Sequence, residues 1–472
     1  MNTTVSAYLG ARPDPRAGAF RASPACADDM GVTALVPTYT AADGDRSASL
    51  RLCVGAARAA ARQAGDMPLA LLVVDNGLSP AAARRLGELL STSGCAYHVL
   101  PAPGPVGQRY AAAQARNAGL AFLGELPADS PLRHRYLLFL DDDTAPAPDS
   151  LALLREALDA RDHAIAACPR VVPVADLAHW LGTAGQPART ARTAGRAPAD
   201  QPRRLAGPLT EAGYDLLSVT SHGSLVTGRT VGLLVRLDPV LDLIRAHGPL
   251  FYEHTPYGSS EDMLVMAVLS RLGELWRVPG ATVADEARST PGSTLRQQFA
   301  WGYDHAWLAR ALAEANLLDA GVHVLGWRPG TGWEHTHADW GACNGFLINP
   351  AELRLAHRLL TAIGDDQGVA AEMFGATAPR VAAGTHLLGR VLARWQAGAD
   401  PECREGPALR RIRTDLPPLG SRDWASMRDG MDALIGHVAG NAVGSLDNCT
   451  DPAALPPFFL YGARQPAAPP PA

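Results

Sequence analysis

The chain has 472 residues, 47% of them hydrophobic, and a formal net charge of −5. This length allows about two or three domains of ~150 residues each, and the apolar share is enough for a sizeable core. The charge balance has no basic excess, so we expect no nucleic-acid partner. The apolar runs fall short of the ~20 residues that cross a bilayer, which predicts no membrane span.

The residue types exclude several kinds of site. The sequence contains no lysine, so Schiff-base, pyridoxal-phosphate and P-loop lysine chemistry cannot operate in this chain. The seven cysteines include no Cys-x-x-Cys pair and favour neither a zinc ribbon nor a disulfide framework. Because the N-terminus also lacks the layout of a signal peptide, we expect a cytoplasmic protein.

Strand and helix patterns alternate in the first third of the chain. After a polar, loose leader at residues 1–30, four apolar runs predict buried strands, and three segments of helical period separate them. Alternation of this kind predicts an α/β fold with a doubly wound, mostly parallel sheet. The strands are expected at 32–40, 68–77, 96–102 and 135–143, and the helices at 50–65, 79–94 and 106–124.

The rest of the chain changes character. Residues 182–208 are rich in Pro, Gly, Ala and Arg, which predicts a mobile excursion within an α/β domain over 31–315. A mainly helical region is expected over 316–464, and a Pro/Ala tail over 465–472. Helices are expected near 259–273, 294–315, 350–363, 380–397 and 421–438.

Three consecutive acids, Asp141, Asp142 and Asp143, follow the apolar run of the fourth strand. Their carboxylates repel one another, so a cation or bulk water must offset the charge. In an extended strand, residues two apart face the same way, which would bring Asp141 and Asp143 together and turn Asp142 aside. Two such carboxylates suit Mg²⁺ or Mn²⁺, which also take oxygens from substrate phosphates. A solvated acidic turn is the alternative.

Asp75 ends the second predicted strand. Because ligands bind at the carboxyl ends of the strands in such sheets, we expect Asp75 and the acid triplet to face one crevice.

Five segments occur in a characteristic order over roughly residues 31–310: ALVPTYT, LLVVDNG, GQRYAAAQARNAGL, LLFLDDDT and SSEDMLV. Together they resemble the family 2 glycosyltransferases of the GT-A fold. The resemblance implies a metal-dependent enzyme that moves a hexosyl or N-acetylhexosaminyl group from a nucleotide-diphospho-sugar, usually UDP-linked, to an acceptor hydroxyl. A Gln-x-x-Arg-Trp signature is only partly kept, because Ala300 replaces the arginine. That signature is strongest in processive, membrane-bound synthases, so its erosion favours transfer of a single sugar.

The resemblance also implies residue roles at the donor. The nucleoside would lie against Pro37, Thr38, Tyr39 and Asp75, and Arg109 would flank the base.

The DXD motif of the family falls on Asp141 and Asp143. Asp141 would lie near the ribose and the metal, Asp143 would be the firmest ligand of Mn²⁺ or Mg²⁺, and Asp142 would add a donor contact.

The Glu-Asp pair of the family falls on Glu261 and Asp262, with Asp262 as the general base of an inverting reaction. A sugar hydroxyl is a poor nucleophile at neutral pH, so a carboxylate must accept its proton. A structural reading is also open. Ser259 and Asp262 resemble a capping box, and both acids suit the positive end of a helix.

Three further positions are weaker candidates. His305 would match the downstream histidine that some GT-A relatives add to the metal. His222 and Gly223 fall in a segment that commonly borders the acceptor in this fold. Trp301 offers an aromatic surface for a sugar ring, although core packing explains it equally well.

Three other functions stay open. A retaining transferase would use Asp262 only to bind substrate. A sugar nucleotidyltransferase would normally have a Gly-rich, basic loop after its first strand. A non-catalytic sugar-nucleotide-binding protein would need neither metal nor base. The sequence does not identify the acceptor, for which a small molecule is one candidate, or the oligomeric state.

Overall fold

A computed structural model describes the chain in thirteen stretches. These are residues 30–38, 47–102, 112–184, 203–204, 217–219, 230–258, 261–286, 292–314, 322–324, 327–328, 332–333, 350–396 and 422–448.

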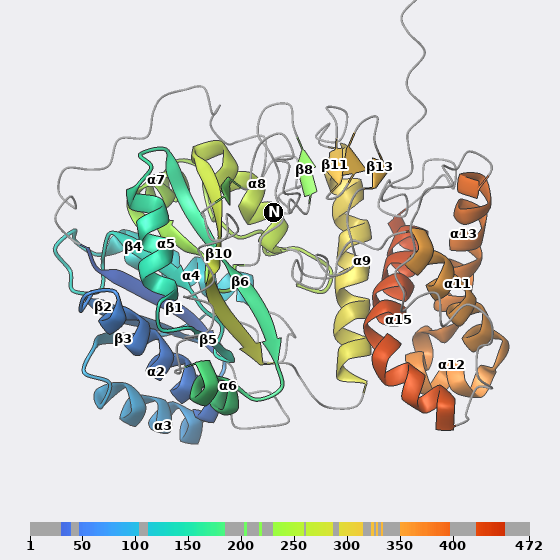
Figure 1. Cartoon of the computed structure of the whole chain (residues 1–472), viewed down its shortest axis with the longest axis horizontal. Coiled ribbons are helices and arrows are strands. Elements are labelled where there is room, and N and C mark those ends of the chain that lie inside the picture. Colours follow the sequence, from blue (N-terminus) through green and yellow to red (C-terminus); the bar gives the residue numbers. More distant parts are fainter. Residues whose placement is uncertain are drawn as a thin grey trace, which may run out of the picture.

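A nine-stranded sheet forms the centre of the N-terminal part, in the order β3-β2-β1-β4-β9-β6-β10-β5, with β7 paired to β10 (Figure 1). The pairings run β1, β2, β3, β4, β6 and β10 in one direction and β5, β7 and β9 in the other. The strands are β1 (Val32–Thr38), β2 (Leu69–Asp75), β3 (Ala96–Pro101), β4 (Tyr136–Phe139), β5 (Thr144–Pro146), β6 (Ala164–Val174), β7 (Arg203–Arg204), β9 (Leu234–Arg236) and β10 (Glu274–Glu286).

Helices cover both faces of this sheet because successive strand residues point to opposite sides. In β1, Leu35 belongs to one apolar core, which α4, α7 and α8 cover. Its neighbours Ala34 and Val36 belong to a second core, which α2, α3 and α5 cover. The helices are α2 (Ser47–Gln63), α3 (Pro80–Ser91), α4 (Ala112–Glu125), α5 (Ser150–Asp159), α6 (Leu177–Ala184), α7 (Leu237–His247) and α8 (Glu261–Leu272).

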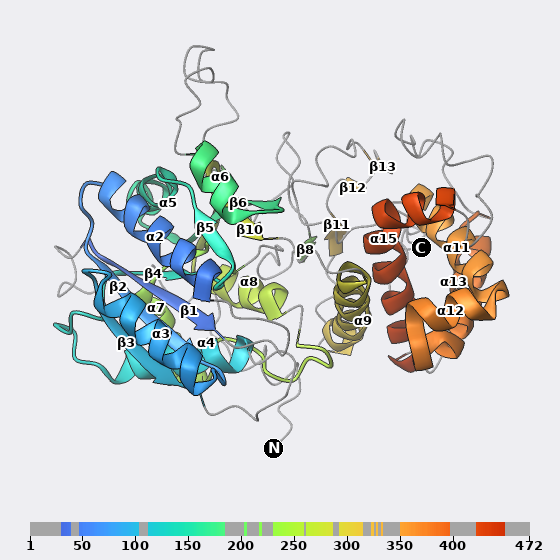
Figure 2. The ribbon, with the colours of Figure 1, turned by 90° about the horizontal axis from the view of Figure 1, so that it is seen from below.

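A second, helical body forms from the C-terminal part of the chain. Its core is made by α9, α11, α12, α13 and α15, and α9 runs alongside α15 in both views (Figures 1 and 2). The helices are α9 (Ser293–Glu314), α11 (Pro350–Asp365), α12 (Gln367–Phe374), α13 (Ala378–Gln396) and α15 (Arg422–Asn448), and η3 (Gly375–Thr377) is a short 3₁₀ turn. Two small antiparallel sheets pair β8 (Leu217–Val219) with β11 (Val322–Val324), and β12 (Trp327–Arg328) with β13 (Gly332–Trp333).

Glycines allow α9 and α15 to approach closely. A Cβ built on Gly440 would lie 1.9 Å from the carbonyl oxygen of Phe299, and one on Gly436 would lie 2.4 Å from that of Leu295. On the α9 side, a Cβ on Gly302 would lie 2.0 Å from the carbonyl oxygen of His437. The two backbones therefore touch where no side chain fits between them.

The predicted α/β class, the doubly wound and mostly parallel sheet, and the helical C-terminal region are confirmed. The helix expected at 106–124 is described from Ala112, and the strand expected at 135–143 is shorter, since β4 ends at Phe139. The predicted tail, and the leader apart from Met30, lie outside the described residues, as does most of the excursion at 182–208. Among the described helices, none combines the length and the apolar character that crossing a membrane requires.

Candidate active site

The acid triplet lies in a tight turn at the carboxyl end of β4. The Thr144 N–H and its Oγ1 hydroxyl both donate to the Asp141 carbonyl, at 3.2 and 2.8 Å. The Cys53 thiol lies 3.4 Å from the same oxygen. The extended geometry expected for Asp141 and Asp143 is therefore wrong, because Thr144 closes the chain into a turn.

Asp142 faces the interior of the protein and contacts β1. Its side chain is buried, and its Oδ2 accepts a hydrogen bond of 2.8 Å from the Thr38 hydroxyl. Two residues expected to contact the donor thus contact each other, and they tie the end of β1 to the turn after β4.

Asp75 lies at the carboxyl end of β2, directly opposite Thr38 in the sheet register. Its Oδ1 accepts from the backbone N–H groups of Gly77 and Leu78, at 3.0 and 2.7 Å. Gly77 has a φ of 101°, a conformation that favours glycine. The Asp75 carboxylate therefore shapes its own turn, beside half-buried Pro37 on the neighbouring strand.

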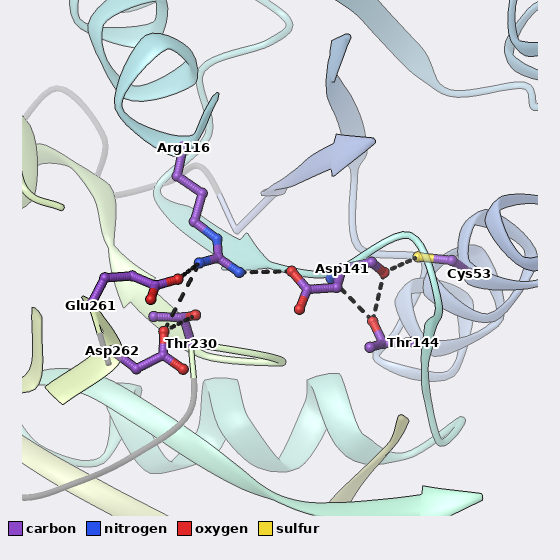
Figure 3. Close-up of polar contacts among 7 residues, drawn as sticks. All are labelled: Cys53, Arg116, Asp141, Thr144, Thr230, Glu261 and Asp262. Atoms are coloured by element: carbon purple, nitrogen blue, oxygen red, sulfur yellow. Dashed lines mark hydrogen bonds and ion pairs between the residues drawn. The ribbon is translucent and has the colours of Figure 1, made fainter. Parts of the chain in front are cut away.

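Arg116 joins the two acidic motifs (Figure 3). It lies on α4, and its Nη2 donates to Asp141 Oδ1 at 2.7 Å. Its Nη1 donates to Glu261 Oε1 at 3.0 Å and lies 3.9 Å from Asp262 Oδ1. One guanidinium therefore bridges the turn after β4 and the first turn of α8.

The surroundings of Arg116 shift the pKa of its guanidinium and of the neighbouring Glu261 carboxyl. Burial by itself would lower the pKa of Arg116, but the charges of Asp141, Asp262 and Glu261 outweigh burial and raise that pKa above its ordinary value. Burial, together with the nearby charge of Asp262, raises the pKa of Glu261 to about 8, against the opposing effect of Arg116. Arg116 therefore stays charged, while burial favours the protonated form of Glu261.

Asp262 is the more accessible member of the Glu-Asp pair. Its side chain is 27% exposed, against 10% for Glu261. The Thr230 hydroxyl donates to Asp262 Oδ1 at 2.6 Å. Burial raises the pKa of Asp262, while Arg116 and this hydrogen bond lower it. A solvent-reachable carboxylate with a raised pKa is the type of group that can accept a proton near neutral pH.

Asp141 and Asp143 are the carboxylates that were expected to bind a cation. The described residues contain no cluster of three or more His, Cys, Asp or Glu that could hold a metal ion. Arg116 contacts only Oδ1 of Asp141, whose side chain is 32% exposed, and Asp143 is half-buried beside it. Mg²⁺ needs only one or two protein carboxylates when phosphates and water complete its shell. Asp141 and Asp143 therefore fit such a cation, and oxygens from phosphate and water would complete its coordination shell.

The remaining predicted positions divide into two groups. Trp301 is half-buried on α9, and His305 lies on the same helix, one turn further on. The other four, Tyr39, Arg109, His222 and Gly223, lie outside the described residues.

The ARNAG segment was expected to serve packing, with Arg116 near a phosphate or in solvent, and the bridge that Arg116 makes between the two acidic motifs was not predicted. A signal was present, because the polar side chains of Arg116 and Asn117 lie in the middle of a helix that is rich in Ala and Gly. Each is buried, and Asn117 bonds to the segment that precedes α8.

No family model matches the chain. No curated protein matches it either. Solved structures similar to this one include residues 1–349 of S. aureus TarS, with 13% identity, a TM-score of 0.36, and coverage of 78% of this chain and 92% of that one. The same fragment in complex with UDP has 12% identity, a TM-score of 0.38, and coverage of 87% and 90%. A further S. aureus TarS structure has 14% identity, a TM-score of 0.34, and coverage of 77% and 54%. Because these identities and TM-scores are low, we base no inference on them.

Proposed function

We propose that the protein is a metal-dependent glycosyltransferase that moves one hexosyl or N-acetylhexosaminyl group from a nucleotide-diphospho-sugar to an acceptor hydroxyl. The observation that carries this proposal is the bridge made by Arg116 between Asp141 and the Glu261–Asp262 pair. The turn at Asp141 would bind a diphosphate through a cation, and the Glu261–Asp262 pair holds a candidate base. The bridge places these two groups on opposite sides of one guanidinium. Both are needed for displacement of a diphosphate by a hydroxyl.

The donor would lie over the carboxyl ends of β1, β2 and β4. Pro37, Thr38 and Asp75 line the first two of these ends, and we assign them to the nucleoside, with UDP favoured. Asp141 and Asp143 would hold Mn²⁺ or Mg²⁺, which when bound neutralises charge that builds on the departing diphosphate.

Asp262 would act at the acceptor. Its carboxylate takes the proton of the acceptor hydroxyl while the oxygen forms a bond to the anomeric carbon. The bond from that carbon to the diphosphate oxygen breaks, and the nucleoside diphosphate leaves with the electron pair. Because Asp262 and the metal-binding carboxylates lie on different sides of Arg116, we favour attack from the face opposite the leaving group, and therefore inversion.

Glu261 and Arg116 would set the charge of this base. A protonated Glu261 adds no negative charge beside Asp262, and Arg116 stabilises the ionised form of Asp262. We favour a small molecule as the acceptor. We also predict that the protein is cytoplasmic.

A donor screen tests the proposal. The melting temperature of the protein is measured with UDP, GDP and dTDP sugars, each with and without MnCl₂. We expect a UDP-sugar to raise the melting temperature only when manganese is present. Asp143→Asn should abolish that shift, and Asp176→Asn, at an exposed acid of the same domain, should keep it. The absence of a response to every nucleotide would contradict the proposal.

A further inference from the structure

We propose that residues 249–258, called the strap, position the base Asp262, and that Asn117 and Asp304 are the positioning residues that hold the two ends of the strap. The strap connects α7 to α8 and ends three residues before Glu261. This inference rests on the proposed function. It gives a role to the strap and to α9, which take no direct part in the proposed reaction.

Asn117 fixes the start of the strap to α4. Its Nδ2 donates to the Phe251 carbonyl at 2.8 Å and to Glu253 Oε1 at 2.7 Å. Its Oδ1 accepts from the Phe251 N–H at 2.8 Å. One buried amide thus takes up both backbone groups of Phe251, which would otherwise need partners in a buried place.

Asn117 is also the neighbour of Arg116. The two residues hold different parts of the same region, since Arg116 binds Glu261 and Asn117 binds the strap that leads to Glu261. A shift of the strap relative to α4 would therefore displace the carboxylates from the guanidinium.

Asp304 fixes the end of the strap to α9. Its side chain is fully buried, and its Oδ1 accepts from the Tyr257 N–H at 2.9 Å. Tyr257 also packs edge-on against Tyr303, with ring centroids 4.9 Å apart, and Tyr252 stacks on Trp307 at 5.7 Å. The strap thus lies along one side of α9.

The helix α9 is also held by α15. Gly440 and Gly444 would place a Cβ 1.9 and 2.7 Å from the carbonyl oxygens of Phe299 and Tyr303. Because α9 is in direct contact with both the strap and α15, the helical C-terminal body and the candidate base share one support.

The size of the effect follows from the chemistry of proton transfer. A base works only within hydrogen-bond reach of the hydroxyl, and a misplacement of ~1 Å can lower the rate by ~10²-fold. Loosening the strap should therefore lower kcat and leave donor binding unchanged, because the donor contacts β1, β2 and β4.

Full-length variants test the strap. Asn117→Ala and Asp304→Ala each remove one anchor. Asp304→Asn is the conservative variant, since its amide oxygen can still accept from the Tyr257 N–H. Asp366→Ala is the matched control, because it removes a carboxylate that accepts from two backbone N–H groups at the start of α12. Hydrogen exchange of residues 250–264, kcat and the donor KM are measured for each protein.

We expect both anchor variants to speed amide exchange in the strap by about tenfold or more and to lower kcat by about tenfold, with the donor KM within about twofold of wild type. Asp304→Asn should stay within about threefold of wild type, and Asp366→Ala should change exchange only near α12. Unchanged exchange in the strap, an unchanged kcat, or failure of Asp304→Asn to restore kcat would overturn the inference.

Two further measurements keep the test decisive. If Asp304→Ala does not fold, Asn117→Asp replaces it, because the new carboxylate keeps the acceptor for the Phe251 N–H and loses both donors. If the wild-type protein transfers no sugar, the proposed function fails, and the strap is judged by exchange and by the Arg116–Glu261 distance in a crystal structure of Asn117→Ala. An unchanged distance there, with unchanged exchange, would overturn the strap as well.

Discussion

Arg116 Nη2 lies 2.7 Å from Asp141 Oδ1, and the arginine side chain is only 4% exposed. This pair explains in part why three acids can follow the apolar strand β4. One carboxylate is neutralised by a buried arginine, one is bonded to Thr38 inside the protein, and Asp143 is left half-exposed at the edge of the site. The turn after β4 is therefore stable without a bound cation, and it still has carboxylate oxygens that a cation can bind.

Replacement of Arg116 should be strongly destabilising. Arg116→Met would leave the carboxylates of Asp141 and Asp262, which lie 2.7 and 3.9 Å from the guanidinium, without their buried cation, and removing one partner of a buried ion pair costs ~3–5 kcal/mol. Urea unfolding measures the change in free energy. Arg245→Met is the control, because the Arg245–Asp242 pair is 61% and 67% exposed, and such pairs contribute ~1 kcal/mol or less. Equal, small losses for the two variants would show that the buried bridge is not formed.

Protonation of Glu261 should make stability depend on pH. Burial and then Asp262 raise the pKa of Glu261 from 4.5 to about 8, so the folded state binds more protons than the unfolded state between these values. Where the folded state binds more protons, the free energy of unfolding falls as pH rises. We expect stability from this group to be complete below pH 4.5 and to decline through about pH 8. Glu261→Gln should flatten that decline, and an unchanged slope in the variant would contradict the assignment.

Loss of the base should lower kcat far more than donor affinity. Asp262→Asn keeps the shape of the side chain and cannot take a proton, so kcat should fall by ~10²–10⁴-fold. UDP affinity, measured by calorimetry, should change by less than about threefold. Wild-type kcat should rise with pH as Asp262, whose pKa is raised, loses its proton. Asp242→Asn, at an exposed acid, should keep full activity, and an active Asp262→Asn enzyme would favour the retaining mechanism.

The contact between α9 and α15 should tolerate no side chain at Gly440. A Cβ there would meet the Phe299 carbonyl at 1.9 Å, so Gly440→Ala must separate two helices, at a cost of ~1–3 kcal/mol. Gly55→Ala is the matched control on α2, where a Cβ has nothing within 4 Å. There the same substitution should stabilise by ~0.5–1 kcal/mol. Thermal unfolding of both variants measures the difference, and a stable Gly440→Ala protein would show that the helices are further apart.

The sequence predicted the strands β1, β2, β3 and β4 because local patterns determine them, whereas β5, β6, β7, β9 and β10 of the same sheet were not predicted. Leu35 and Val36 alternate between two cores, and turn residues such as Gly77 mark the strand ends. The order of the motifs also placed Asp141 and Asp262 as candidates for one site, and in the structure both lie close to the same guanidinium.

The rest of the site depends on contacts between distant parts of the chain. Arg116 pairs with Glu261 across 145 residues, and Asp304 bonds to Tyr257 across 47. No local period or turn signal encodes such partners. The turn at Asp141 was mistaken for extended strand because the prediction used apolar continuity, whereas the hydroxyl of Thr144 decides the backbone path there.

A crystal of the protein soaked with MnCl₂ and UDP, examined by anomalous scattering at the manganese edge, tests the central claim most directly. We expect one manganese peak in contact with Asp141 and Asp143, with the diphosphate on the same ion and Asp262 open to solvent beyond Arg116. Density for UDP at another place, or no peak while Asp141 stays paired with Arg116 alone, would contradict the assignment of this turn to a metal-bound sugar nucleotide.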